Sequence, residues 1–203
     1  MDMSKKKPYI KKRVFGPKLA IKFKEVQQIT QNLYDEGKIR DLALFRCGID
    51  TMLRASDLVR LYLSEVTDRS GEPLKRTSVL MKKTGEIVEV SLLAETREAL
   101  KLWIAERPPF SGVWLFPGGR KGQPLTEQRY RQRLKVWIEQ IGQDPALYST
   151  HSIRRTKAST MYEANKDIKA VSMLLGHRDT KITERYLGVT REDALSQAER
   201  TKI

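Results

Sequence analysis

The hydrophobic pattern of the chain has a helical period over most of its length. Apolar residues recur every three or four positions in several stretches, the spacing that places them on one face of a helix. The stretch from residue 39 to 52 is apolar on most of its surface, so we expect that helix at the centre of the core. The predicted helices cover residues 23–34, 39–52, 94–106, 126–138, 149–165, 168–175 and 191–203.

The middle of the chain instead predicts a small β region. Residues 61–66 suggest a strand, and residues 77–81 and 87–91 suggest two strands that pair across the loop KKTGE. Thr84-Gly85 suits a tight hairpin because its second residue needs a positive φ. The expected fold class is therefore mainly α with a small antiparallel β-sheet (α+β).

Small polar residues and one glycine mark the expected helix ends. Thr126, Ser149 and Asp167 each precede a helical pattern and are suitable N-caps. Ser56 is placed to cap a short helix after residue 54. Gly176 ends the helix that begins after Asp167, as a left-handed C-terminal residue.

Length and composition narrow the possible functions. A chain of 203 residues with 39% hydrophobic content predicts one or at most two domains. Its net charge of +14 predicts attraction to polyanions. No apolar run approaches the length of a membrane span and no signal-peptide region follows the basic start, so a cytoplasmic protein is expected. One cysteine and two histidines exclude an internal disulfide and zinc sites of the usual spacing, and we expect no metal and no cofactor.

Residues 1–20 form a strongly basic stretch that includes Pro8, Gly16 and Pro17. We expect a flexible arm able to lie along phosphates, and a merely solubilising tail fits the composition equally well. Cys47 lies in an apolar stretch and is expected to be a small buried hydrophobic residue.

The candidate chemistry is concentrated near the C-terminus. His151 and Arg154 share one face of the first helical turn, where free N–H groups favour an anion. A guanidinium beside an imidazole suits the oxygens of a phosphate. His177 directly follows Gly176, and Tyr186 follows His177 by nine residues. Each feature taken alone has a plain structural interpretation, a charged surface helix for the first pair and a packing residue for Tyr186.

Together, the order and spacing of His-x-x-Arg, Leu-Gly-His and the tyrosine resemble the tyrosine recombinases (the phage integrase family). The resemblance implies an upstream catalytic arginine, here Arg54, with Asp57 as a supporting acidic residue. It also implies a lysine on a hairpin, commonly written Lys-Thr-Gly, which selects Lys83. Lys82 is the neighbour in the opposite register, and only one of the two can face the cleft. Without the resemblance, Arg54 would be interpreted as a surface cation and the lysines as solvated turn residues.

The resemblance implies a site-specific recombinase that cuts and rejoins DNA through a covalent 3′-phosphotyrosyl intermediate, in integration, excision or inversion. Tyr186 would be the nucleophile, Arg54 and Arg154 would hold the non-bridging oxygens, and Lys83 would be the general acid. His151 and His177 would position the phosphate and share the proton transfers.

The same resemblance implies partners and a domain plan. The partners would be double-stranded DNA, three further copies in a homotetramer on DNA, and accessory DNA-bending proteins, in a bacterial cytoplasm with its nucleoid or plasmids. Residues 21–189 would form the catalytic domain, and residues 190–203 a tail that docks on a neighbouring protomer. Relatives usually carry a separate N-terminal DNA-binding domain. The chain would therefore be either a short recombinase, similar to those of fimbrial phase variation, or the catalytic half of a longer protein.

Further basic residues are candidates for DNA contact. The helix from residue 126 to 138 alternates basic and apolar positions, as expected of a helix that packs on a core and faces DNA. A solvated charged face is a fair alternative. The DNA-binding candidates are Arg129, Arg131, Arg133, Lys135, Lys82 and Arg155.

Two other functions remain open from the sequence. A type IB topoisomerase-like enzyme would share the nucleophile and the arginines but would relax supercoils as a monomer. A non-catalytic DNA-binding or architectural protein would use the charge alone, and would not need Tyr186 and His177 in register.

Overall fold

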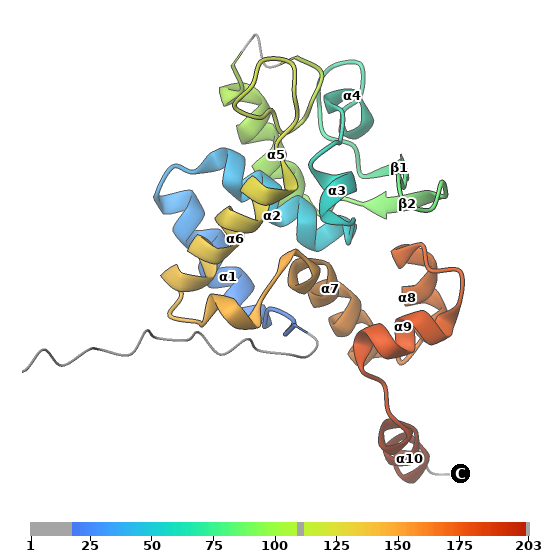
Figure 1. Ribbon diagram of the computed structural model, residues 1–203. Coiled ribbons are helices and arrows are strands. Elements are labelled where there is room, and N and C mark those ends of the chain that lie inside the picture. Colours follow the sequence, from blue (N-terminus) through green and yellow to red (C-terminus); the bar gives the residue numbers. More distant parts are fainter. Residues whose placement is uncertain (1–17, 109–111, 202–203) are drawn as a thin grey trace, which may run out of the picture.

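The computed structural model describes residues 18–108 and 112–201. The predicted basic arm therefore lies largely outside the described residues. Figure 1 shows a mainly helical molecule with one small hairpin at its edge, which confirms the predicted fold class. The elements are α1 (Phe23–Asp35), α2 (Ile39–Thr51), α3 (Ala55–Leu58), α4 (Leu63–Val66), β1 (Arg76–Leu80), β2 (Ile87–Ser91), α5 (Ala94–Glu106), α6 (Glu127–Gln140), the 3-10 turn η1 (Pro145–Leu147), α7 (Thr150–Asn165), α8 (Ile168–Leu175), α9 (Thr180–Leu187) and α10 (Arg191–Arg200).

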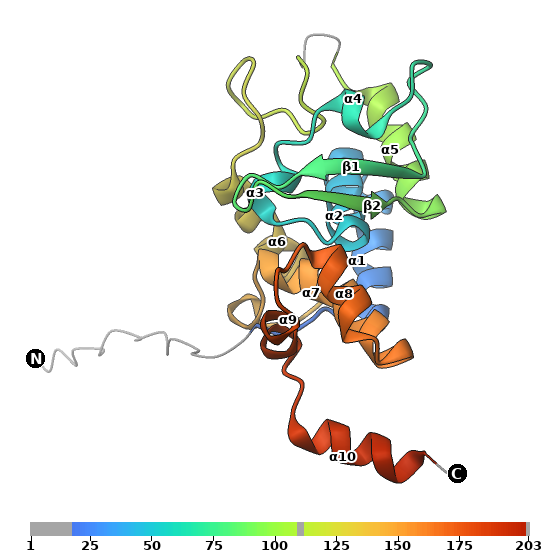
Figure 2. The same cartoon turned by 90° about the vertical axis from the view of Figure 1, so that its right-hand side faces the viewer.

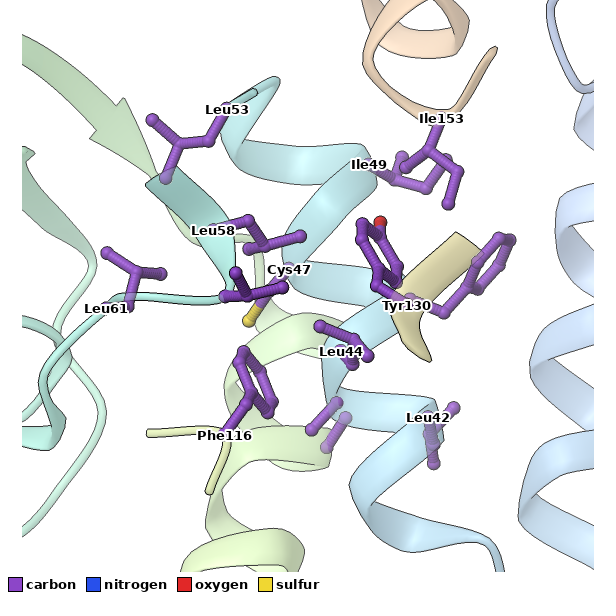
Figure 3. Packing of buried hydrophobic residues seen from close by; sticks show 14 of the residues in the cluster. Leu42, Leu44, Cys47, Ile49, Leu53, Leu58, Leu61, Phe116, Tyr130 and Ile153 are labelled. Atoms are coloured by element: carbon purple, nitrogen blue, oxygen red, sulfur yellow. The ribbon is translucent and has the colours of Figure 1, made fainter. Parts of the chain in front are cut away.

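Helix α2 is the centre of the core, as its pattern predicted. It packs against α1, α5 and α7, and Figure 3 shows its Leu44 and Cys47 among side chains from several other elements. Gly48 permits this close packing because a Cβ there would lie 2.7 Å from the Tyr130 hydroxyl and 2.8 Å from Ile153. Contact with α6 and α7 at one glycine fixes α7, and hence the candidate site, relative to the core.

The hairpin forms in the predicted place. Strands β1 and β2 are antiparallel with Val79 opposite Val88 and Leu80 opposite Ile87. The two valines are buried, so the inner face of the hairpin packs on the protein body. Gly85 has a φ of +70°, the conformation for which the Thr-Gly pair was singled out.

The strand predicted for residues 61–66 is wrong. Residues Leu63–Val66 form the helical turn α4, in which the Glu65 carboxylate accepts the Tyr62 N–H at 2.7 Å. Only Tyr62 makes a strand-like bridge, to Trp114. A carboxylate three residues after the start of the turn satisfies a free N–H group, and this local bond favours a helical turn over the expected strand.

Most of the predicted helix ends are confirmed. The Ser149 hydroxyl accepts the His151 N–H, the Asp167 carboxylate accepts the Ala170 N–H, and Gly176 is left-handed with a φ of +59°. The prediction for Ser56 is wrong. Arg54 occupies the N-cap position of α3, without a side-chain cap, and Ser56 lies inside the helix.

The last helices form a separate layer on α7. Helices α8 and α9 pack on it around a small buried cluster that includes Met52, Val171 and Leu175. Figures 1 and 2 show α10 standing away from this layer. Docking of residues 190–203 on a neighbouring protomer stays a prediction. Among the helices of the described ranges, none is long and apolar enough to cross a membrane.

Candidate active site

Tyr186 lies at the wall of a cavity of about 450 Å3 between α7 and α9. Its hydroxyl donates a hydrogen bond to the backbone oxygen of His151 at 3.1 Å. The His177 ring meets the tyrosine ring edge-on, with 5.8 Å between ring centres, and the Arg155 guanidinium lies 5.8 Å from the tyrosine ring centre. The fold therefore brings His151, His177, Arg155 and Tyr186 to one hollow.

Two arginines supply buried donors beside this hollow. Arg154 is 2% exposed and one of its terminal nitrogens donates to the backbone oxygen of Leu175 at 2.5 Å. Its other terminal nitrogen, Nη1, and the Nη1 of Arg54 are buried without a hydrogen-bond partner among the described residues. A buried unpaired donor is costly, and a charged one more so, which makes this pair suitable for an anion that supplies the missing acceptors.

The two arginines also act on one another. Burial, and next the positive charge of Arg54, lower the pKa of Arg154 to about 10. Asp57 opposes this effect, since its carboxylate is buried and its charge favours the protonated guanidinium. The structure therefore places Asp57 near Arg154, and its supporting role stays a prediction.

Both histidines are neutral near pH 7 in this structure. Burial, followed by the charges of Arg154 and Arg54, lowers the pKa of His177 to about 4. The same causes, with Lys83 and Arg131 contributing, lower the pKa of His151. A neutral imidazole offers one donor and one acceptor, so each ring can serve as a hydrogen-bonding group rather than as a further cation.

The nucleophile candidate, Tyr186, is a protonated phenol near neutral pH. Burial raises the pKa of Tyr186, while the charges of Arg154 and Arg155 work in the opposite direction. A bound phosphate would neutralise part of that positive charge. Removal of the phenolic proton therefore needs a group that accepts it during the reaction.

Lys83 lies on the hairpin loop, on the side of the molecule near His151. Its side chain is exposed, and its charge is close enough to His151 to contribute to the lowered pKa of that ring. The preceding residue is anchored, because the Lys82 N–H donates to the Asp57 carboxylate at 3.0 Å. The hairpin loop thus sits next to the segment that carries Arg54 and Asp57.

The remaining DNA-contact candidates are spread over several faces. All four basic residues of α6 are exposed, but residues two apart on a helix point in different directions. Arg131 is near enough to His151 to affect its pKa, and Arg129 lines a separate recess of about 720 Å3 with Arg60 and Arg120. Arg133 lies apart from the site and pairs with Asp41 at 3.4 Å.

Sequence reasoning missed three residues that shape the site. The hydroxyl of buried Thr183 is 2.9 Å from Nδ1 of His177. Arg178 bonds to Glu86 and to the backbone of the hairpin loop. A signal for Thr183 was present, because it precedes Tyr186 by three residues and therefore shares its face of α9. No local pattern signals the pairing of Arg178 with Glu86, which are far apart in sequence.

In the two described ranges, no group of three or more histidine, cysteine, aspartate or glutamate side chains is placed to hold a metal ion.

In comparisons with known proteins, the matched part of the chain contains these site residues. The sequence matches the phage integrase family over residues 20–193. It is 29% identical over 175 residues to the probable integrase/recombinase YoeC of Bacillus subtilis, covering 83% of this chain and 87% of that protein. It is 33% identical over 154 residues to the tyrosine recombinase XerC of Neisseria meningitidis serogroup B, covering 75% of this chain and 48% of XerC. The chain thus spans about half the length of this XerC relative.

Solved structures share the fold. The XerH site-specific recombinase bound to a palindromic difH substrate superposes with a TM-score of 0.71 at 20% identity, over 91% of this chain and 54% of XerH. A lambda integrase dimer bound to a core site gives a TM-score of 0.65 at 18% identity, over 94% of this chain and 52% of that chain. The family match covers more than half of the sequence and includes His151, Arg155, His177 and Tyr186. The chain therefore belongs to the phage integrase family, the tyrosine recombinases.

Proposed function

We propose that this protein is a site-specific DNA recombinase that cuts and rejoins strands through a covalent bond between Tyr186 and a DNA 3′ phosphate. The observation that carries the proposal is the arrangement of the hollow. A tyrosine hydroxyl and two neutral imidazoles line it, and two guanidinium groups, each with a buried unpaired nitrogen, lie beside it. This set of groups suits a phosphodiester that is attacked by a phenol.

In the proposed first step, the Tyr186 oxygen attacks the phosphorus and loses its proton to a group of the site. Arg54 and Arg154 donate to the two non-bridging oxygens, whose charge grows in the transition state. The bond from phosphorus to the 5′ oxygen breaks, and Lys83 gives that oxygen a proton. The products are a phosphotyrosine linked to the 3′ end and a free 5′ hydroxyl.

His151 and His177 position the phosphate and take part in the proton transfers. Their neutral state is what these roles need, because a neutral ring can accept a proton from the phenol or donate a hydrogen bond to the phosphate. Rejoining is the same reaction in reverse, with the 5′ hydroxyl of another strand as the attacking group. The bond energy is kept in the phosphotyrosine, so no nucleotide cofactor is required.

The proposed partner is double-stranded DNA, bound by four copies of the chain when two sites are recombined, with accessory DNA-bending proteins as further partners. The net charge of +14, and the exposed Arg131 whose charge acts on His151, support DNA binding. The solved structures with this fold include a recombinase bound to its difH substrate and a lambda integrase dimer bound to a core site. The XerC relative is about twice as long as this chain. That this chain alone binds DNA is therefore a part of the proposal in its own right.

The test uses nicked duplexes that lose a short fragment on cleavage and so trap the covalent product. We expect a protein–DNA band that survives denaturation and disappears in Tyr186→Phe. Tyr162→Phe is the matched control, because Tyr162 packs on the same small cluster as Tyr186 but lies outside the hollow. Binding without a covalent band at every site tested would favour the non-catalytic alternative, and site-independent relaxation of supercoils would favour the topoisomerase.

A further inference from the structure

The hairpin loop that carries Lys83 is held by the residue that follows His177. Nε of Arg178 donates to the Glu86 carboxylate at 2.9 Å, and a terminal nitrogen donates to the backbone oxygen of Thr84 at 3.4 Å. Thr84 directly follows Lys83 in the loop. Arg178 itself directly follows His177, so one side chain joins the backbone of the general-acid loop to the backbone of the histidine turn.

The strand behind this contact is packed tightly on the same turn. A Cβ on Gly176 would lie 2.8 Å from a methyl group of Val88, which is 5% exposed. The glycine turn therefore approaches β2 as closely as sterics allow. On the other side of the loop, the Lys82 N–H is bound by the buried Asp57 carboxylate. The loop is thus fixed from the Arg54 side and from the His177 side at once.

We propose that Arg178 is a positioning residue that couples the Lys83 loop to the His177–Tyr186 segment. The inference rests on the proposed function, in which Lys83 must reach the departing 5′ oxygen while Tyr186 attacks the same phosphorus. The Asp57 carboxylate ties the loop to the protein body at Lys82. The other side of the loop, from Thr84 to Glu86, is hydrogen-bonded within the hairpin to Met81. The bond from Arg178 to Glu86 ties that side to the histidine turn.

The expected size of the effect follows from the exposure of the pair. The side chains of Arg178 and Glu86 are 72% and 42% exposed, so water and salt screen the interaction. Exposed ion pairs of this kind shift an equilibrium by about two- to five-fold. Arg178→Gln should therefore reduce the cleavage rate by about that factor. Arg178→Glu should reduce it further, because two carboxylates would then face each other.

The experiment compares charge-reversed variants in two assays. The first is single-turnover formation of the covalent complex at saturating DNA, which separates the rate from binding. The second is hydrogen exchange of residues 82–86 in the protein without DNA. The charge swap Arg178→Glu/Glu86→Arg restores the pair, whereas Arg178→Glu/Glu89→Arg restores only the net charge. Glu89 is a suitable control because it is exposed on the same strand and pairs with Ser78 rather than with the turn.

The proposal predicts faster hydrogen exchange of the loop in Arg178→Glu, recovery in the Glu86 swap and no recovery in the Glu89 control. Cleavage should follow the same order while the midpoint of thermal unfolding stays unchanged. Unchanged exchange in Arg178→Glu, or equal recovery in both double variants, would overturn it. The second result would mean that Arg178 acts through its charge on DNA. If the wild type forms no covalent complex, the proposed function fails, and the exchange assay still decides whether Arg178 fixes the loop.

Discussion

Replacement of Gly176 by alanine tests how tightly the histidine turn packs on the hairpin. Gly176 has a φ of +59°, and a left-handed conformation costs a residue with a Cβ about 1 kcal/mol. The new methyl group would also lie 2.8 Å from a Val88 methyl group, and overpacking of a core contact costs about 1–3 kcal/mol. The expected loss in the free energy of unfolding is therefore about 2–4 kcal/mol for Gly176→Ala.

Urea unfolding measures this loss, and two variants separate its causes. Gly188 has a φ of +76° but a Cβ there would meet only an Arg155 nitrogen at 3.4 Å, so Gly188→Ala should cost about 1 kcal/mol. In a Val88→Ala background the clash is gone, and Gly176→Ala should again cost only about 1 kcal/mol, which leaves a coupling energy of about 1–3 kcal/mol. An equal cost of Gly176→Ala with and without Val88 would refute the close approach.

Three further outcomes are expected. Thr183→Val should slow single-turnover cleavage about three- to ten-fold, because it removes the hydroxyl that orients His177. Thr183→Ser should keep most of the rate, and equal rates for the two variants would contradict this role. The pKa of His177 is lowered from 6.5 to about 4, so its contribution to the free energy of unfolding is present above pH 6.5 and lost as the pH falls towards 4. His177→Gln should flatten urea-measured stability over that window, and an unchanged profile would show that other groups control it. Arg131→Ala should lower the slope of log affinity against log salt by about 0.9 in a DNA-binding titration. Arg133→Ala should change the slope less, because Arg133 is already paired with Asp41. The reverse order would place the DNA on the other face of α6.

Local patterns predicted most of the fold. The helical period located α1, α2 and α5 to α8 to within a few residues, and the caps at Ser149, Asp167 and Gly176 are as expected. The error at residues 61–66 shows the limit of such patterns. A short segment that begins with a few apolar residues fits a strand and a helical turn equally well, and there the bond from Tyr62 to Glu65 decides.

The candidate site could be predicted only in part, because local spacing places some of its residues and not others. His151 and Arg154 lie one helical turn apart, so their common face follows from spacing alone. The positions of Arg54 and Lys83 came from resemblance, and the structure brings both near the histidines. The bond from Arg178 to Glu86 joins residues 92 apart in sequence, and only the folded chain shows it.

The alternating charges of α6 were expected to form one face. Alternation on a helix instead spreads them, and Arg133 pairs with Asp41 away from the hollow.

The most direct test of the central claim is to identify the residue and the DNA end that become joined. The covalent product from a nicked duplex is digested with protease and nuclease, and the modified peptide is sequenced by mass spectrometry. The account predicts a nucleotide adduct on Tyr186 through a 3′ phosphate, together with a cleaved strand whose free 5′ hydroxyl accepts a label from polynucleotide kinase. An adduct on another residue, a 5′-phosphate linkage, or no adduct at all would contradict it.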